Sequence, residues 1–171
     1  MPGITFPNVE TVRQLKELNK FFRENMTFAV LWDVQNVNIG KNYEKIKKVV
    51  NYLSQFGRLS IAKAYADWSD STLKEFSEHL SVHHFELIHV AKPKKNTADM
   101  IMITHGIEIA LNNPSVGTFI LISGDKDFRP LVLALRRNGK RIHLISISKN
   151  TDKDLIKLAD SYTDISVILD S

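Results

Sequence analysis

The chain has 171 residues, of which 43% are hydrophobic and 25% charged, proportions that are typical of a globular domain and exclude a disordered or low-complexity chain. It contains no cysteine, which excludes disulfides, thiol nucleophiles and cysteine-ligated metal sites. The net charge of +4 permits a polyanionic partner, but it identifies none until the positions of the charges are known.

The sequence shows no sign of a membrane or secretory segment. The longest uninterrupted apolar runs are five residues, far below the ~18 needed to span a bilayer. The amino-terminal residues show neither a basic start nor the apolar core of a signal peptide. We therefore expect a cytoplasmic protein that makes no contact with a membrane.

The first predicted element is an amphipathic helix over residues 9–25. Val12, Leu15 and Leu18 recur every three positions between charged residues, which predicts an apolar face packed on something larger. We assign residues 1–26 to an N-terminal helical extension that could also pair two chains into a homodimer. Residues 27–171 form the main domain.

The main domain alternates between apolar segments typical of buried strands and charged segments typical of helices. We predict strands at 27–32 and near 60–66, 85–90, 118–123 and 141–147, helices near 42–56, 70–80, 98–112, 128–138 and 151–160, and a last apolar piece at 165–169. Parallel neighbours need a crossover of a dozen or more residues, which these helices provide. The predicted fold class is α/β, a three-layer α/β/α sandwich with a central, mainly parallel sheet.

Four aspartates stand where such a sheet binds ligands, at the carboxyl ends of its strands. Asp33 ends the first strand, Asp125 and Asp127 follow the fourth, and Asp99 begins the helix between the third and fourth. Facing carboxylates repel one another unless protons or cations intervene. Oxygen ligands suit Mg²⁺ or Mn²⁺, which makes phosphodiester hydrolysis a candidate reaction.

Each aspartate also has a purely structural interpretation. Asp127 could cap the helix that follows it, with Asp125 as a turn residue. Asp99 lies where the first turn of a helix favours negative charge, and Asp33 could bind its own loop. Their joint placement favours a site.

Three segments carry a family resemblance. They are DVQN at 33–36, KNTAD at 95–99 and SGDKDF at 123–128. They resemble the three acidic motifs of NYN domains, which are PIN-like metal-dependent nucleases, and the similarity extends over roughly residues 27–168. The SGDKDF segment is the most specific of the three.

The resemblance implies a PIN-like fold and an endoribonuclease. Asp33, Asp99, Asp125 and Asp127 would hold Mg²⁺ or Mn²⁺, and a metal-activated water would cleave RNA to leave a 5′-phosphate and a 3′-hydroxyl. Asn36 would support the metal or the phosphate by hydrogen bonding. Ser123 would orient an acid or contact a metal-bound water.

Basic residues near the acids are candidates for binding the RNA backbone. Lys92, Lys94 and Lys95 form a loop just before Asp99, and Arg129 directly follows the SGDKDF segment. A solvated lysine loop is an equal alternative, because no aromatic residue lies among the lysines to stack a base. His79 and His83, four residues apart, raise a zinc alternative that lacks a third ligand.

Two other functions remain open at this stage. The chain could be an RNA-binding regulatory module that keeps the fold with little or no catalysis. It could also use the same acids as a phosphatase or as a nuclease acting on DNA, since the acids alone do not distinguish the sugar.

Overall fold

The computed structural model describes residues 8–91 and 97–171. Its centre is one sheet of six strands in the order β3-β2-β1-β4-β5-β6, with every neighbouring pair parallel. The strands are β1 (Thr27–Asp33), β2 (Arg58–Ala66), β3 (Glu86–His89), β4 (Val116–Ile122), β5 (Arg141–Ser146) and β6 (Ser161–Asp164). The predicted parallel α/β sheet is confirmed.

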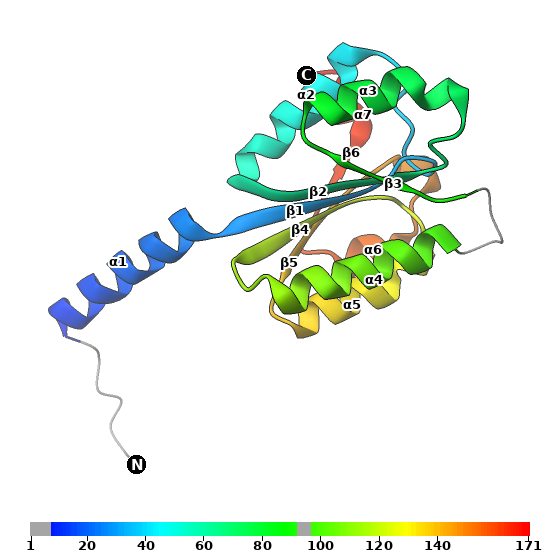
Figure 1. Cartoon of the computed structure of the whole chain (residues 1–171). Coiled ribbons are helices and arrows are strands. Elements are labelled where there is room, and N and C mark those ends of the chain that lie inside the picture. The colour runs from blue at the N-terminus through cyan, green and yellow to red at the C-terminus, as the bar shows by residue number, and fades with distance from the viewer. Residues whose placement is uncertain (1–7, 92–96) are drawn as a thin grey trace.

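Helices cover both faces of the sheet (Figure 1). One layer holds α2 (Tyr43–Leu53), α3 (Lys74–Val82) and α7 (Ile165–Leu169); the other holds α4 (Thr97–Asn112), α5 (Arg129–Arg137) and α6 (Lys153–Leu158). Single 3-10 turns are η1 (Ser54–Phe56), η2 (Ser71–Leu73), η3 (Lys126–Phe128) and η4 (Ser148–Asn150). The three-layer arrangement is therefore also confirmed.

The central strands explain why the layers form. Residues 28–32 of β1 are all at most 1% exposed. Phe28, Val30 and Trp32 pack with α2, α3 and α7, whereas Ala29 and Leu31 pack with α4, α5 and α6. An uninterrupted apolar strand is thus buried on both of its faces, as parallel strands require.

Helix α4 positions one of the four aspartates. Gly106 lies at its contact with α5, where an added Cβ would come within 2.6 Å of Leu131 and 3.2 Å of Leu31. This close packing fixes the helix against the sheet, with Asp99 in its first turn. No helix within the described ranges is long and apolar enough to cross a membrane.

The sixth strand was not predicted from the sequence. β6 is short and polar, and it pairs with β5 through residues such as Ser161, which lies opposite His143. His143 Nδ1 and Ser161 Oγ are 2.6 Å apart. Asp164 then caps α7 by accepting a hydrogen bond from Ser166 N, so the final apolar piece is a helix.

The predicted amphipathic helix at residues 9–25 is α1 (Val9–Asn25), and it extends away from the sheet (Figure 1). Its apolar side chains that the structure describes are exposed, Leu15 by 50% and Leu18 by 52%. Met26, the residue that links α1 to β1, packs on Gly117, where an added Cβ would overlap the Met26 side chain. The division of the chain at residue 26 stays a prediction.

Candidate metal centre

The strand order reverses between β1 and β4, and this switch point creates a crevice at the carboxyl edge of the sheet. Asp33 is the last residue of β1, and the segment that contains Asp125 follows β4 directly. Asp99 enters from the first turn of α4. Three elements that are distant in sequence therefore bring their acids to one edge.

Asp99, Asp125 and Asp127 form the tightest part of this cluster. Each offers one carboxylate oxygen such that these oxygens all lie within 4.8 Å of one another. Oxygens that share one Mg²⁺ at ~2.1 Å are at most ~4.2 Å apart, so small side-chain adjustments suffice for a common ion. An all-carboxylate donor set of this spacing fits Mg²⁺ or Mn²⁺.

Asp33 lies beside this group, although its oxygens are not among those within 4.8 Å. The pKa of Asp33 is raised to about 6, chiefly by burial and also by the nearby charges of Asp99 and Asp125, against two hydrogen bonds that lower it. Those bonds come from Asn36 N and Ser123 Oγ, both at 3.3 Å. Burial, and then the charges of Asp125 and Asp127, also raises the pKa of Asp99.

The turn after β4 brings two of the carboxylates together. Asp125 is the N-cap of η3, and its Oδ1 accepts a hydrogen bond from Asp127 N at 3.0 Å. The sequence allowed Asp127 to act as a helix cap. In the structure Asp125 is the residue that caps η3, and Asp127 is the second residue of this turn. A capping role and a ligand role are compatible, because a carboxylate has a second oxygen.

Ser123 and Asn36 connect the acids to their loops. The Ser123 hydroxyl donates to Asp33 and accepts from Asp125 N at 3.3 Å, so it orients two acids, and the residue is 1% exposed. Asn36 Oδ1 accepts from Gly124 N at 2.8 Å. The Asn36 amide oxygen therefore ties the loop after β1 to the loop after β4.

Of the four basic residues predicted to bind the RNA backbone, the structure describes Arg129. Lys92, Lys94 and Lys95 lie outside the described residues. Arg129 donates two hydrogen bonds to Asp152, Nε to Oδ1 at 2.8 Å and Nη2 to Oδ2 at 2.6 Å, and it contacts Asp154 at 3.3 Å. The hydrogen bond to Asp152 raises the pKa of Arg129 above its usual value.

A cavity of about 400 Å³ adjoins the acidic cluster on the side of β5. Its lining includes Lys126, Lys149, Asn150 and Thr151, for which the sequence patterns predicted no role. The available signal was the polar run after the fifth strand, since ligands bind beyond the carboxyl ends of strands. The distance between this polar run and the turn after β4 depends on how the two loops fold.

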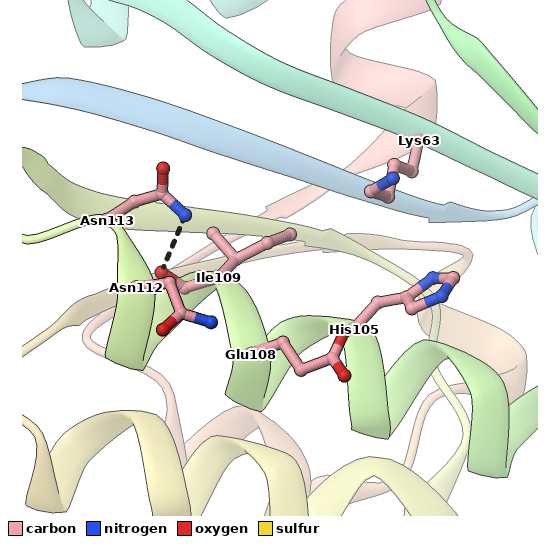
Figure 2. Close-up of a pocket in the computed structure, with 6 residues that line it drawn as sticks. All are labelled: Lys63, His105, Glu108, Ile109, Asn112 and Asn113. Atoms are coloured by element: carbon pink, nitrogen blue, oxygen red, sulfur yellow. Dashed lines mark hydrogen bonds between the residues drawn. The ribbon is translucent and has the colours of Figure 1, made fainter.

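Two other groups of polar residues do not form a metal centre. Figure 2 shows a cavity of about 280 Å³ between α4 and β2, where Lys63 and His105 line the space with Glu108 as the one described carboxylate. His79 and His83 lie against the ring of Tyr43, with ring centroids 4.9 and 6.0 Å away. Across residues 8–91 and 97–171, the aspartates are the one group of three or more possible metal ligands.

Comparisons with known proteins bear on the fold and the family. A solved structure of a protein of unknown function from Vibrio parahaemolyticus is 28% identical, with a TM-score of 0.69 over 83% of this chain and 94% of that one. No curated protein matches significantly. Residues 27–167 match the NYN domain, a family of the PIN-like superfamily of nucleases. The chain therefore belongs to the NYN domain family.

Proposed function

We propose that this protein is a metal-dependent endoribonuclease that hydrolyses RNA phosphodiester bonds at the cluster of Asp33, Asp99, Asp125 and Asp127. The observation that carries the proposal is the approach of three carboxylate oxygens to within 4.8 Å at the switch point of an NYN-family sheet. A fourth carboxylate beside them has a raised pKa. Clustered carboxylates of this kind favour cation binding and reaction at phosphate.

The residues divide into ligands and supports. Asp99, Asp125 and Asp127 are the ligands that the geometry favours, with Asp33 as the fourth. When bound, a Mg²⁺ or Mn²⁺ ion would supply charge neutralisation at the scissile phosphate and a lower pKa for the attacking water. Ser123 holds Asp33 and the backbone of Asp125 in place, and Asn36 holds the loop on which Asp125 lies.

Binding of the RNA backbone belongs to the same proposal. Lys92, Lys94 and Lys95, which lie outside the described residues and precede α4 in the sequence, stay candidates for binding the RNA backbone. Arg129 contributes through its pairing, since it neutralises Asp152 beside the site and need not touch RNA itself. A cytoplasmic location and a homodimer stay predictions from the sequence.

The reaction class is tested with the full chain on labelled RNA and on DNA of the same sequence, with Mn²⁺, with Mg²⁺ and with EDTA. The proposal predicts cleavage of RNA with either ion, no cleavage in EDTA, and products that end in a 5′-phosphate. RNA binding without cleavage under every condition would instead establish a regulatory module. Cleavage confined to DNA would assign the same acids to another substrate.

A further inference from the structure

The cavity beside Asp125 is an open hollow lined by residues of three loops, which follow β1, β4 and β5. It has a volume of about 400 Å³. Asn36 comes from the first loop, Lys126 from the second, and Lys149 and Asn150 from the third. The cavity therefore lies at the carboxyl edge of the sheet, in contact with the metal centre through Asp125.

Gly124 joins these loops into one wall. Its N–H donates to Asn36 Oδ1 at 2.8 Å, and its carbonyl accepts from Asp152 N at 3.0 Å. An added Cβ would lie 2.8 Å from Thr151 Oγ1 and 3.0 Å from Thr151 Cα, which leaves no space for a side chain. The glycine permits the close approach of the loops after β4 and β5, so the shape of the cavity is built into the fold.

Two lysines and two aspartates line the cavity, and Asp125 is the aspartate on the side of the metal centre. Lys126 and Lys149 are exposed, and neither forms an ion pair within the described ranges. The carboxylate of Asp152, which also lines the cavity, accepts hydrogen bonds from Arg129 at both oxygens. With that charge neutralised, the wall facing away from the metal centre is positive.

The lining chemistry selects a phosphate and sugar over a base. The described lining residues include no aromatic or aliphatic side chain, and stacking of a base needs one. Lysine binds phosphate as a point charge, and the amides of Asn36 and Asn150 can donate to oxygen. The Asn36 amide nitrogen remains available, because the bond to Gly124 uses its oxygen.

We propose that this cavity is a nucleotide subsite that binds the sugar and backbone phosphate next to the scissile bond of RNA, an inference that rests on the proposed nuclease function. Lys126 and Lys149 bind the phosphate, and Asn36 and Asn150 donate hydrogen bonds to the sugar or phosphate oxygens. The RNA strand then crosses the carboxyl edge of the sheet from the region of Asp99 toward β5.

The test measures the affinity of a short fluorescein-labelled single-stranded RNA by anisotropy over a series of salt concentrations. The Asp99→Asn background suits it, because that substitution lies outside the cavity and blocks cleavage under the proposed function. Lys126→Ala/Lys149→Ala is expected to weaken binding and to lower the slope of log Kd against log salt by at least about 0.7, the effect of one lost single-strand phosphate contact.

Two further variants isolate the cavity from general charge. Arg137→Ala/Arg141→Ala removes two exposed charges at the opposite, amino end of the sheet and is expected to leave the slope unchanged. Lys126→Arg/Lys149→Arg keeps the charge and is expected to restore the slope. An unchanged slope in the Lys→Ala pair, or an equal loss in the arginine pair, overturns the subsite.

Failure of the subsite is distinguishable from failure of the proposed function. If the unsubstituted chain cleaves RNA with Mn²⁺ but the Lys→Ala pair keeps its full salt slope, the subsite is wrong and the nuclease stands. If the slope falls as expected but no RNA is cleaved with any divalent ion, the nuclease is wrong and a phosphate-binding cavity stands.

Discussion

Asp33 is the acid whose charge is most affected by the fold, because it ends a fully buried strand. Its pKa of about 6, raised chiefly by burial, lies above the ordinary value of 3.8. Compared with the unfolded chain, the folded chain therefore favours the protonated form of Asp33. The contribution of Asp33 to stability is complete below pH 3.8 and is lost as the pH rises through about 6.

The direction of this pKa shift predicts how the stability of Asp33→Asn depends on pH in EDTA. Asparagine does not titrate. The free energy of unfolding of Asp33→Asn, minus that of the unsubstituted chain, should therefore rise by about 2–3 kcal/mol between pH 4 and pH 8. Urea unfolding of both proteins at the two pH values measures the difference. A constant difference across this window would show that burial does not shift the pKa of Asp33.

At this scale the sequence predicted the acids better than their surroundings. Asp33, Asp99 and Asp125 lie in compact motifs, so their approach follows once the strands are placed at the switch point. Lys149 belongs to a different loop, and its position beside Lys126 depends on the contact between Gly124 and Thr151. A contact between loops that are 27 residues apart leaves no local pattern.

At the scale of elements, apolar content explains which strands the sequence revealed. β1 and β4 are almost wholly apolar because both of their faces are buried. β6 is polar and lies at the edge of the sheet, where its hydrogen bonds to β5 and the contact of Ser161 with His143 hold it. Such an edge strand has neither the alternation nor the apolar run that predicts strands.

The sequence predicted that the apolar face of α1 packs on something larger. Within the described residues, Val12, Leu15 and Leu18 on this face are exposed. One residue links α1 to β1, shorter than the 2–6 residues that usually let a helix fold back on its strand. A second copy of the chain, with the same face on its own α1, is the partner that the homodimer prediction assigns to this face.

The predicted homodimer is tested by light scattering of the full chain and of Leu15→Glu/Leu18→Glu. The unsubstituted chain is expected to have the mass of a dimer and the variant that of a monomer, because two charges on each helix disrupt an apolar contact. Arg13→Glu, on the charged side of α1, serves as the control and should remain dimeric. A monomeric unsubstituted chain would contradict the pairing.

At the scale of the whole molecule, the fold and the site are consequences of one arrangement. The parallel sheet with helices on both faces creates the switch point between β1 and β4, and the acids are placed where the strands end there. The alternation of strands and helices in the sequence was sufficient to predict this architecture. The cavity beside Asp125 was not predictable, because it exists only between folded loops.

The role of Asp125 in metal-dependent cleavage of RNA is tested by the substitution Asp125→Asn. Asparagine keeps the oxygen that caps η3, so the fold should be retained, with unfolding free energies within about 0.5 kcal/mol. Asp170→Asn, an exposed substitution at the carboxyl end of α7, is the matched control.

The measurement is the rate of cleavage of labelled RNA with Mn²⁺ by the unsubstituted chain and both variants. We expect Asp125→Asn to lose at least about 100-fold in rate and Asp170→Asn to cleave like the unsubstituted chain. Cleavage by Asp125→Asn at the unsubstituted rate would contradict it.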